Sequence, residues 1–223
     1  MTAQAPDQIF YKDLKLDLVG IEGSGLYTPL DFNIKTRSAS TGCWRGYIMR
    51  YIITESQLIL EGFWFNPVDT EFPLINGIKP IRLTRESGLL GIGFKNEYKN
   101  LNRKIPFNGS IWVAKDFIDS EYVHMGFQSL TAYRTVLKFD FEDGKIMNVE
   151  DNSKKAEEAR QDGDPRGYRP ESMSPEDIND WIIKRFSLDQ PLRPPEPASK
   201  IESTKAEMLE ELERLKKLHK GEE

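Results

Sequence analysis

Alternation of apolar and polar residues runs through the first two thirds of the chain and predicts β-strands. Residues 14–18 (LKLDL) and 135–141 (TVLKFDF) each place leucines or phenylalanines on one face and charged residues on the other. Such a period of two is typical of half-buried strands. Asp143-Gly144 follows the second run and favours a type I′ hairpin turn, because both central residues of that turn need positive φ. A return strand is therefore expected from Ile146.

Two longer apolar runs predict a β-hairpin nearer the N-terminus. Residues 47–53 (YIMRYII) and 58–65 (LILEGFWF) are rich in β-branched and aromatic side chains. The four residues TESQ at 54–57 separate them, which is a common length for a hairpin loop. Residues 110–114 (SIWVA) predict a further short strand. We therefore expect residues 8–150 to form a mainly β domain, built as an antiparallel sandwich or a partly open barrel.

The last third of the chain has a different pattern. Residues 151–173 are too polar to pack, so a flexible polar segment is expected there. Residues 174–187 predict a short amphipathic helix docked on the domain, with Ser174 as N-cap and Pro175 at the first helical position. Residues 188–200 predict a proline-rich linker.

Residues 201–223 predict a helical tail that begins at a capping-box pattern. One face of this tail carries an apolar stripe made by Met208, Leu212, Leu215 and Leu218. An isolated helix of this length has little stability of its own, so the stripe needs a partner surface. We expect that partner to be another protein, a second copy or the chain's own domain.

Composition narrows the classes of function. The chain has 223 residues and a formal net charge of −5, which does not suit a binder of duplex nucleic acid. No apolar window approaches the length of a membrane helix, and no secretion signal is visible. One cysteine and two histidines allow neither a disulfide nor an ordinary zinc site, so we expect no metal and no cofactor. These features predict a cytoplasmic protein.

Cys43 and His124 are the candidate catalytic residues, because they are the only thiol and the only imidazole of the β-rich region. A nucleophilic thiol needs a nearby base or cation, and Arg45 follows two residues after Cys43. The alternative is a small buried cysteine and a structural histidine. The glycine clusters GIEGSG (20–25) and GLLGIG (88–93) lack the following helix of a phosphate loop, so turns or bulges are expected there.

Aromatic residues and an arginine gather around Cys43. The candidate ligand-binding residues are Trp44, Arg45, Tyr47 and Tyr122. If a strand began at Trp44, Arg45 and Tyr47 would share one face, and Trp44 would lie on the other. Aromatic rings beside arginine can stack a flat ligand or single-stranded bases, whereas the alternative is ordinary core packing.

Two stretches resemble an uncharacterised family of small bacterial β-rich proteins. CWRGYIMRYIITESQLIL (43–60) is similar to a hairpin that opens with CWRGY, and EYVHMGFQSLTAYRTVLKFDFEDGKI (121–146) is similar to a segment that opens with EYVHMG. FNGSIWVAKDF (107–117) resembles a strand between them. The resemblance covers about residues 40–147, departs from the pattern at residues 66–103, and implies one module with no known activity.

Two functions are compatible with these patterns. The first is a non-enzymatic protein-binding or accessory protein of an immunity-like kind, which acts through the β-rich domain and the apolar stripe of its tail. The second is a small-molecule or nucleotide-binding protein, or a hydrolase, with a pocket near Cys43, Arg45 and His124. A hydrolase would require the thiol and the imidazole to come within hydrogen-bond reach.

Overall fold

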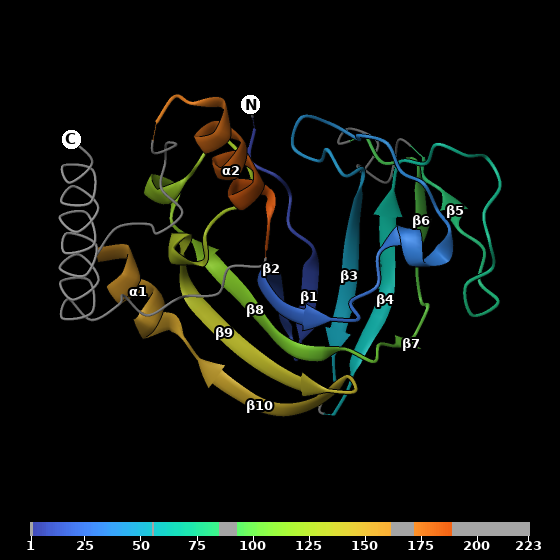
Figure 1. Cartoon of the computed structure of the whole chain (residues 1–223). Helices are drawn as coiled ribbons and strands as arrows, with labels where there is room; N and C mark the ends of the chain where they lie inside the picture. Colours follow the sequence, from blue (N-terminus) through green and yellow to red (C-terminus); the bar gives the residue numbers. More distant parts are fainter. Residues whose placement is uncertain (1, 55, 85–92, 162–171, 189–223) are drawn as a thin grey trace, which may run out of the picture. The chain divides into compact units, whose positions relative to one another are not determined.

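A mixed β-sheet dominates the computed structural model, which describes residues 2–54, 56–84, 93–161 and 172–188 (Figure 1). The strands are β1 Gln8–Tyr11, β2 Leu14–Ser24, β3 Tyr47–Ile53, β4 Leu58–Phe65, β5 Ile81–Arg82, β6 Asn96–Tyr98, β7 Arg103–Lys104, β8 Asn108–Phe117, β9 Tyr133–Glu142 and β10 Lys145–Asp151. The α-helices are α1 Ser153–Gln161 and α2 Pro175–Phe186. Residues 1–192 belong to one compact unit, and the second unit, residues 193–223, lies outside the described residues.

The prediction of a mainly β fold is confirmed, and the sheet is open. Its strand order is β10-β9-β8-β2-β1-β3-β4-β6-β5, with β7 also paired to β4. Neighbouring strands are antiparallel except β1 and β3, which run parallel. β2 and β3 lie on either side of β1, so residues 25–46, which connect them, cross over β1 at one end of the sheet. The crossover ends with the Cys43–Tyr47 stretch, so topology rather than local pattern places these residues.

The sheet curves until its distant parts meet at one end. The amide of Leu58, at the start of β4, donates to the carbonyl of Gly144 in the β9–β10 turn at 2.8 Å, and the Gly144 amide donates to Phe107 at 2.7 Å. The predicted type I′ turn is confirmed by positive φ at Asp143 and Gly144, 48° and 71°. A Cβ at Gly144 would lie 1.8 Å from the carbonyl oxygen of Ile105, so only glycine allows this approach.

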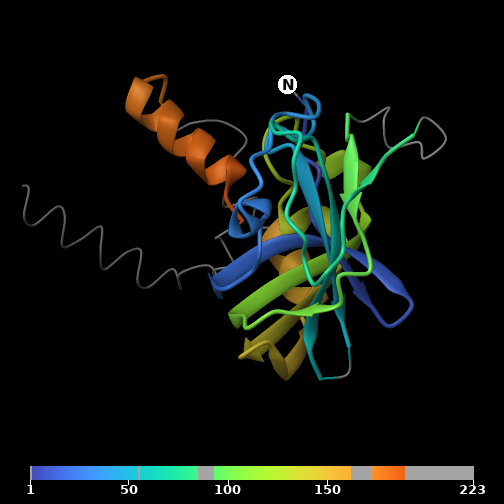
Figure 2. The ribbon, with the colours of Figure 1, turned by 90° about the vertical axis from the view of Figure 1, so that its right-hand side faces the viewer.

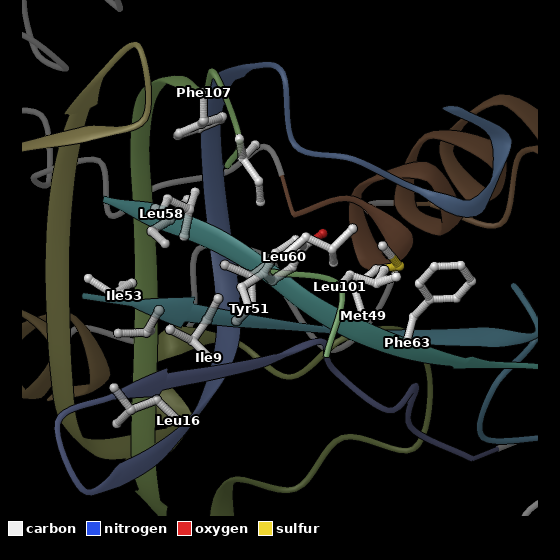
Figure 3. Close-up of a cluster of buried hydrophobic side chains, with 14 of the residues drawn as sticks. Ile9, Leu16, Met49, Tyr51, Ile53, Leu58, Leu60, Phe63, Leu101 and Phe107 are labelled. Carbon is white, nitrogen blue, oxygen red and sulfur yellow. The ribbon is translucent and has the colours of Figure 1, made fainter. Parts of the chain in front are cut away.

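The predicted hairpin has the bounds read from the sequence, and it lines the core. β3 and β4 are Tyr47–Ile53 and Leu58–Phe65, and Tyr51 pairs with Leu60. Figure 3 shows the side chains of β1 to β4 gathered on the same side of the sheet, with Phe107 beside them. Full burial of one leucine, isoleucine, methionine or phenylalanine side chain contributes about 1.5–3 kcal/mol to the stability of the fold.

The opposite face of the hairpin carries a charged cluster. Arg50 is 9% exposed and pairs with Glu97 at 2.6 Å and Glu61 at 3.0 Å. Its guanidinium also lies 4.3 Å from the ring centre of Trp64. Arg50 therefore has its charge neutralised within the sheet, and it is not available to a ligand on the other face.

Helix α1 lies beside β9, as Figure 1 shows. Ala156 is fully buried in a cluster with Trp112 and Val136. Arg160 near the end of the helix donates to the carbonyl of Thr131 at 2.7 Å. The prediction of a polar flexible segment over residues 151–173 did not include this helix, because one small buried alanine gives almost no hydrophobic periodicity.

Helix α2 begins as predicted. The Ser174 hydroxyl accepts a hydrogen bond from the Asp177 amide at 3.1 Å, which is an N-cap contact. Figure 2 shows α2 extending away from the strands, with its C-terminal end nearest to them. Within the described part of the chain, no helix is long and apolar enough to cross a bilayer.

Candidate functional site

A sharp turn before β3 sets the position of the aromatic candidates. The Gly46 amide donates to the Cys43 carbonyl at 3.2 Å, and Gly46 has φ of 74°. A Cβ at Gly46 would lie 2.0 Å from the carbonyl oxygen of Arg37. Because β3 starts only at Tyr47, strand alternation does not extend back to Trp44. The expectation for a strand beginning at Trp44 therefore does not apply, and Trp44 and Arg45 line the same cavity.

This cavity, here called the aromatic cavity, has a volume of about 410 Å³. Its aromatic lining residues are Trp44, Tyr47, Tyr51, Phe127 and Phe186. Three of the four predicted ligand-binding residues, Trp44, Arg45 and Tyr47, therefore come together. Trp44 is 45% exposed, which leaves part of its ring open to solvent.

A buried ion pair forms one wall of the aromatic cavity. The Arg45 guanidinium donates to both oxygens of Asp7, at 2.7 and 2.8 Å. The Met49 amide donates to the same carboxylate at 2.6 Å. The Arg45 guanidinium also lies over the rings of Tyr47, at 4.8 Å, and Phe127, at 5.4 Å. This bidentate geometry fixes the plane of the guanidinium.

Burial changes the titration of the groups around this pair. Burial raises the pKa of Asp7, and this outweighs the opposing influence of Arg45 and of the Met49 amide. Burial also raises the pKa of Tyr51 well above its ordinary value. The Tyr51 hydroxyl therefore stays protonated at neutral pH, and it donates to the carbonyl of Tyr27 at 2.9 Å.

Residues 185–188 are here called the anchor segment, and its last three residues, Phe186, Ser187 and Leu188, line the aromatic cavity. Arg185 is fully buried and donates from Nε and Nη2 to the Met125 carbonyl, at 3.2 and 3.1 Å. The Phe127 amide donates to the Arg185 carbonyl, and the Ile21 amide donates to the Leu188 carbonyl, both at 2.8 Å. These contacts hold the C-terminal end of α2 on the domain.

The ring of Phe186, in the anchor segment, stacks on Trp44. Their centroids are 5.0 Å apart, and the two planes differ by 18°. The aromatic cavity is therefore closed on one side by a contact between the CWRGY turn and the end of α2.

Cys43 lies in a second, mostly apolar cavity of about 370 Å³, here called the Cys43 cavity. The fourth predicted ligand-binding residue, Tyr122, lines this cavity and not the aromatic one. Other lining residues are Ala5, Ile48, Phe94 and Phe117. The structure therefore divides the predicted ligand-binding set between two cavities.

The two candidate catalytic residues have separate environments. Cys43 is 4% exposed, and its Sγ donates to the Tyr47 carbonyl at 3.4 Å. Burial raises the pKa of the thiol, although Arg45 opposes this. His124 is exposed and contacts the Tyr122 ring edge-on at a centroid distance of 5.0 Å. Among the described residues, no hydrogen bond or ring contact joins Cys43 to His124.

We expect slow labelling of Cys43 in the folded protein. Its thiol is buried and has a raised pKa, so the reactive thiolate is scarce at neutral pH. The pH at which labelling by a disulfide reagent becomes fast should lie above that of an unfolded control in denaturant. Rapid labelling at neutral pH, with a midpoint below that of the unfolded chain, would show an activated thiol instead.

Asp7, Phe127 and Phe186 are among the lining residues of the aromatic cavity that were not predicted as ligand-binding. Phe186 had a weak signal, since it closes the apolar face of the predicted helix. Asp7 had none, because a single carboxylate in a polar N-terminal stretch looks solvated until Arg45 is placed beside it. Sequence distance separates each of these residues from the CWRGY turn.

The tail residues Met208, Leu212, Leu215 and Leu218 lie outside the described residues, as does most of the predicted linker. Within the described ranges, no group of three or more His, Cys, Asp or Glu side chains could hold a metal ion. No family model, no curated protein and no solved structure matches the chain.

Proposed function

We propose that the protein binds a small organic ligand in the aromatic cavity, without chemical transformation. The observation that carries this proposal is the cavity itself, a space of about 410 Å³ with five aromatic side chains in its walls. This volume falls in the range of small-molecule sites, which are concave and mainly apolar. The aromatic rings supply large contact areas with little loss of side-chain entropy.

The charged groups beside the cavity support binding rather than catalysis. Asp7 and Arg45 occupy each other's hydrogen-bonding groups, so the carboxylate is held as a structural partner and not as a free base. The Cys43 thiol has a raised pKa and donates to a backbone carbonyl in the other cavity. A binding wall made of paired groups stays in place when a ligand enters, which lowers the ordering cost of binding.

A fragment screen by ligand-observed NMR tests this proposal. Fragments that bind in the aromatic cavity should compete with one another, and Trp44→Ala should weaken them about tenfold or more because it removes a stacking surface. The matched control is Tyr122→Ala, which removes an aromatic ring of similar exposure from the Cys43 cavity. Absence of competing fragments, or equal losses in both variants, would refute the proposal.

A second candidate is the protein-binding, immunity-like accessory function. The observation that favours it is an exposed apolar surface on and before α2: Ile183 is 66% exposed, Ile182 37% and Met173 82%. Such side chains on an otherwise polar helix are typical of a docking face. If the chain associates with itself through this face, Ile183→Ser should shift sedimentation of the full-length protein toward the monomer and leave fragment binding unchanged.

A further inference from the structure

Most polar side-chain groups around the aromatic cavity already have partners within the protein; an exception is the Nε of Arg45, which is buried without a hydrogen-bond partner among the described residues. The Gln4 amide donates to the Thr41 carbonyl at 3.1 Å and accepts from the Trp44 amide at 2.9 Å. The Thr28 hydroxyl donates to Asp31 at 2.9 Å. Tyr51 donates to a backbone carbonyl, as described above. These groups orient the walls, and their donors are already in use before a ligand arrives.

The charged side chains that line the cavity neutralise each other. Asp7 and Arg45 are the charged lining residues, and they form a bidentate pair with each other. The Ala5 carbonyl accepts a further hydrogen bond from Arg45 at 3.2 Å. A charged ligand would lose its hydration on entry and would find no uncompensated charge of opposite sign, so its burial would be costly.

The remaining recognition surface consists of aromatic faces. The Trp44 and Phe186 rings stack on each other, and Trp44, which lines the cavity, is still 45% exposed. Tyr47 and Phe127 lie around the guanidinium of Arg45, which already occupies the favourable position for a cation near both rings. Flat rings offset on such faces gain more than saturated rings of the same size.

We propose that the ligand of the aromatic cavity is an uncharged, flat aromatic molecule. The inference rests on the proposed function, and it adds the chemical class that the cavity selects. Selection arises from the pairing of Asp7 with Arg45, which removes charge recognition, and from the aromatic wall, including the part of Trp44 that Phe186 leaves exposed, which favours planar rings.

A set of naphthalene-sized probes tests the ligand class on the full-length protein. The probes are 2-naphthol (neutral and flat), 2-naphthoate (anionic), 2-naphthylmethylamine (cationic) and decahydro-2-naphthol (neutral and not flat). Isothermal titration calorimetry should give 2-naphthol an affinity more than about tenfold above either charged probe. Its advantage over decahydro-2-naphthol should be about two- to tenfold, the range expected for stacking.

A variant separates aromatic stacking from simple apolar burial. Trp44→Leu keeps an apolar side chain at the cavity but removes the flat face. It should abolish the preference for 2-naphthol over decahydro-2-naphthol while the latter still binds. Tyr122→Ala, in the Cys43 cavity, should leave the affinities and their order unchanged.

The outcomes distinguish the ligand class from the proposed function. If a charged probe or decahydro-2-naphthol binds in the aromatic cavity as tightly as 2-naphthol, the ligand class is wrong and the binding function stands. The same holds if none of the four probes binds while competing fragments are found. If neither the probes nor any fragment binds in the cavity, both proposals fail together.

Discussion

Replacement of Asp7 by alanine should lower the free energy of unfolding by about 3–5 kcal/mol, the usual cost of leaving a buried charge without its partner. Asp7 accepts three short hydrogen bonds, two from Arg45 and one from the Met49 amide. Its side chain is 7% exposed and that of Arg45 is 21% exposed, so solvent screens the pair little. Urea denaturation monitored by tryptophan fluorescence measures the change.

Two further variants test whether the unpaired charge is the cause. Asp7→Leu combined with Arg45→Met replaces the pair by apolar groups of similar size and should recover most of the lost stability. Asp17→Ala is the matched control on β2, because Asp17 is half-buried and accepts a hydrogen bond from the Tyr133 hydroxyl at 3.1 Å. That variant should cost only about 1 kcal/mol. An equal loss of stability in Asp7→Ala and Asp17→Ala would contradict the conclusion that the unpaired charge of Arg45 causes the loss.

Gly126→Ala should detach the anchor segment from the domain. A Cβ at Gly126 would lie 2.1 Å from the carbonyl oxygen of Arg185, and the residue has φ of 75°. The nearest atoms belong to the backbone of Arg185, which cannot move away as a flexible side chain would. We therefore expect the contact between the anchor segment and the domain to be destabilised by about 2 kcal/mol or more. The Phe127 and Ile21 amides, which donate to the anchor segment, should lose roughly thirtyfold or more of their hydrogen-exchange protection.

Gly77→Ala provides the control for the backbone conformation itself. Gly77 has φ of 78°, almost the same as Gly126, but a Cβ there would meet nothing within 4 Å. The variant should therefore lower the free energy of unfolding by about 1 kcal/mol, the conformational cost of positive φ for alanine. Exchange of the Phe127 and Ile21 amides should not change. If both alanine variants leave these amides protected, the close packing of Gly126 on Arg185 is not what holds α2.

The strands were largely predictable because their signals are local. The limits of β3 and β4 follow from two β-rich runs with a short polar loop between them. The turn at Asp143 and Gly144 follows from the φ values that its residues allow. The Ser174 N-cap needed only the residues next to it. Each of these signals depends on backbone sterics and period within about ten residues, which a single sequence contains.

The candidate site was predictable only in part, because its residues come from distant places in the chain. Trp44, Arg45 and Tyr47 were recognised as a group, but Asp7, Phe127 and Phe186 join them only through the crossover and the docking of α2. Tyr122 was placed with them by type and lies in the Cys43 cavity. Pairing of Asp7 with Arg45 depends on the parallel arrangement of β1 and β3, which no local pattern indicated.

The amino-acid sequence by itself determined a mainly β chain, a hairpin at residues 47–65 and a capped helix from Pro175. Those features depend on side-chain period, turn sterics and apolar content, which act between near neighbours. The tertiary structure alone decided that Cys43 and Trp44 line different cavities, and that Arg45 meets Asp7. These outcomes depend on the curvature and strand order of the sheet, where contacts across many residues decide which side chains share a wall.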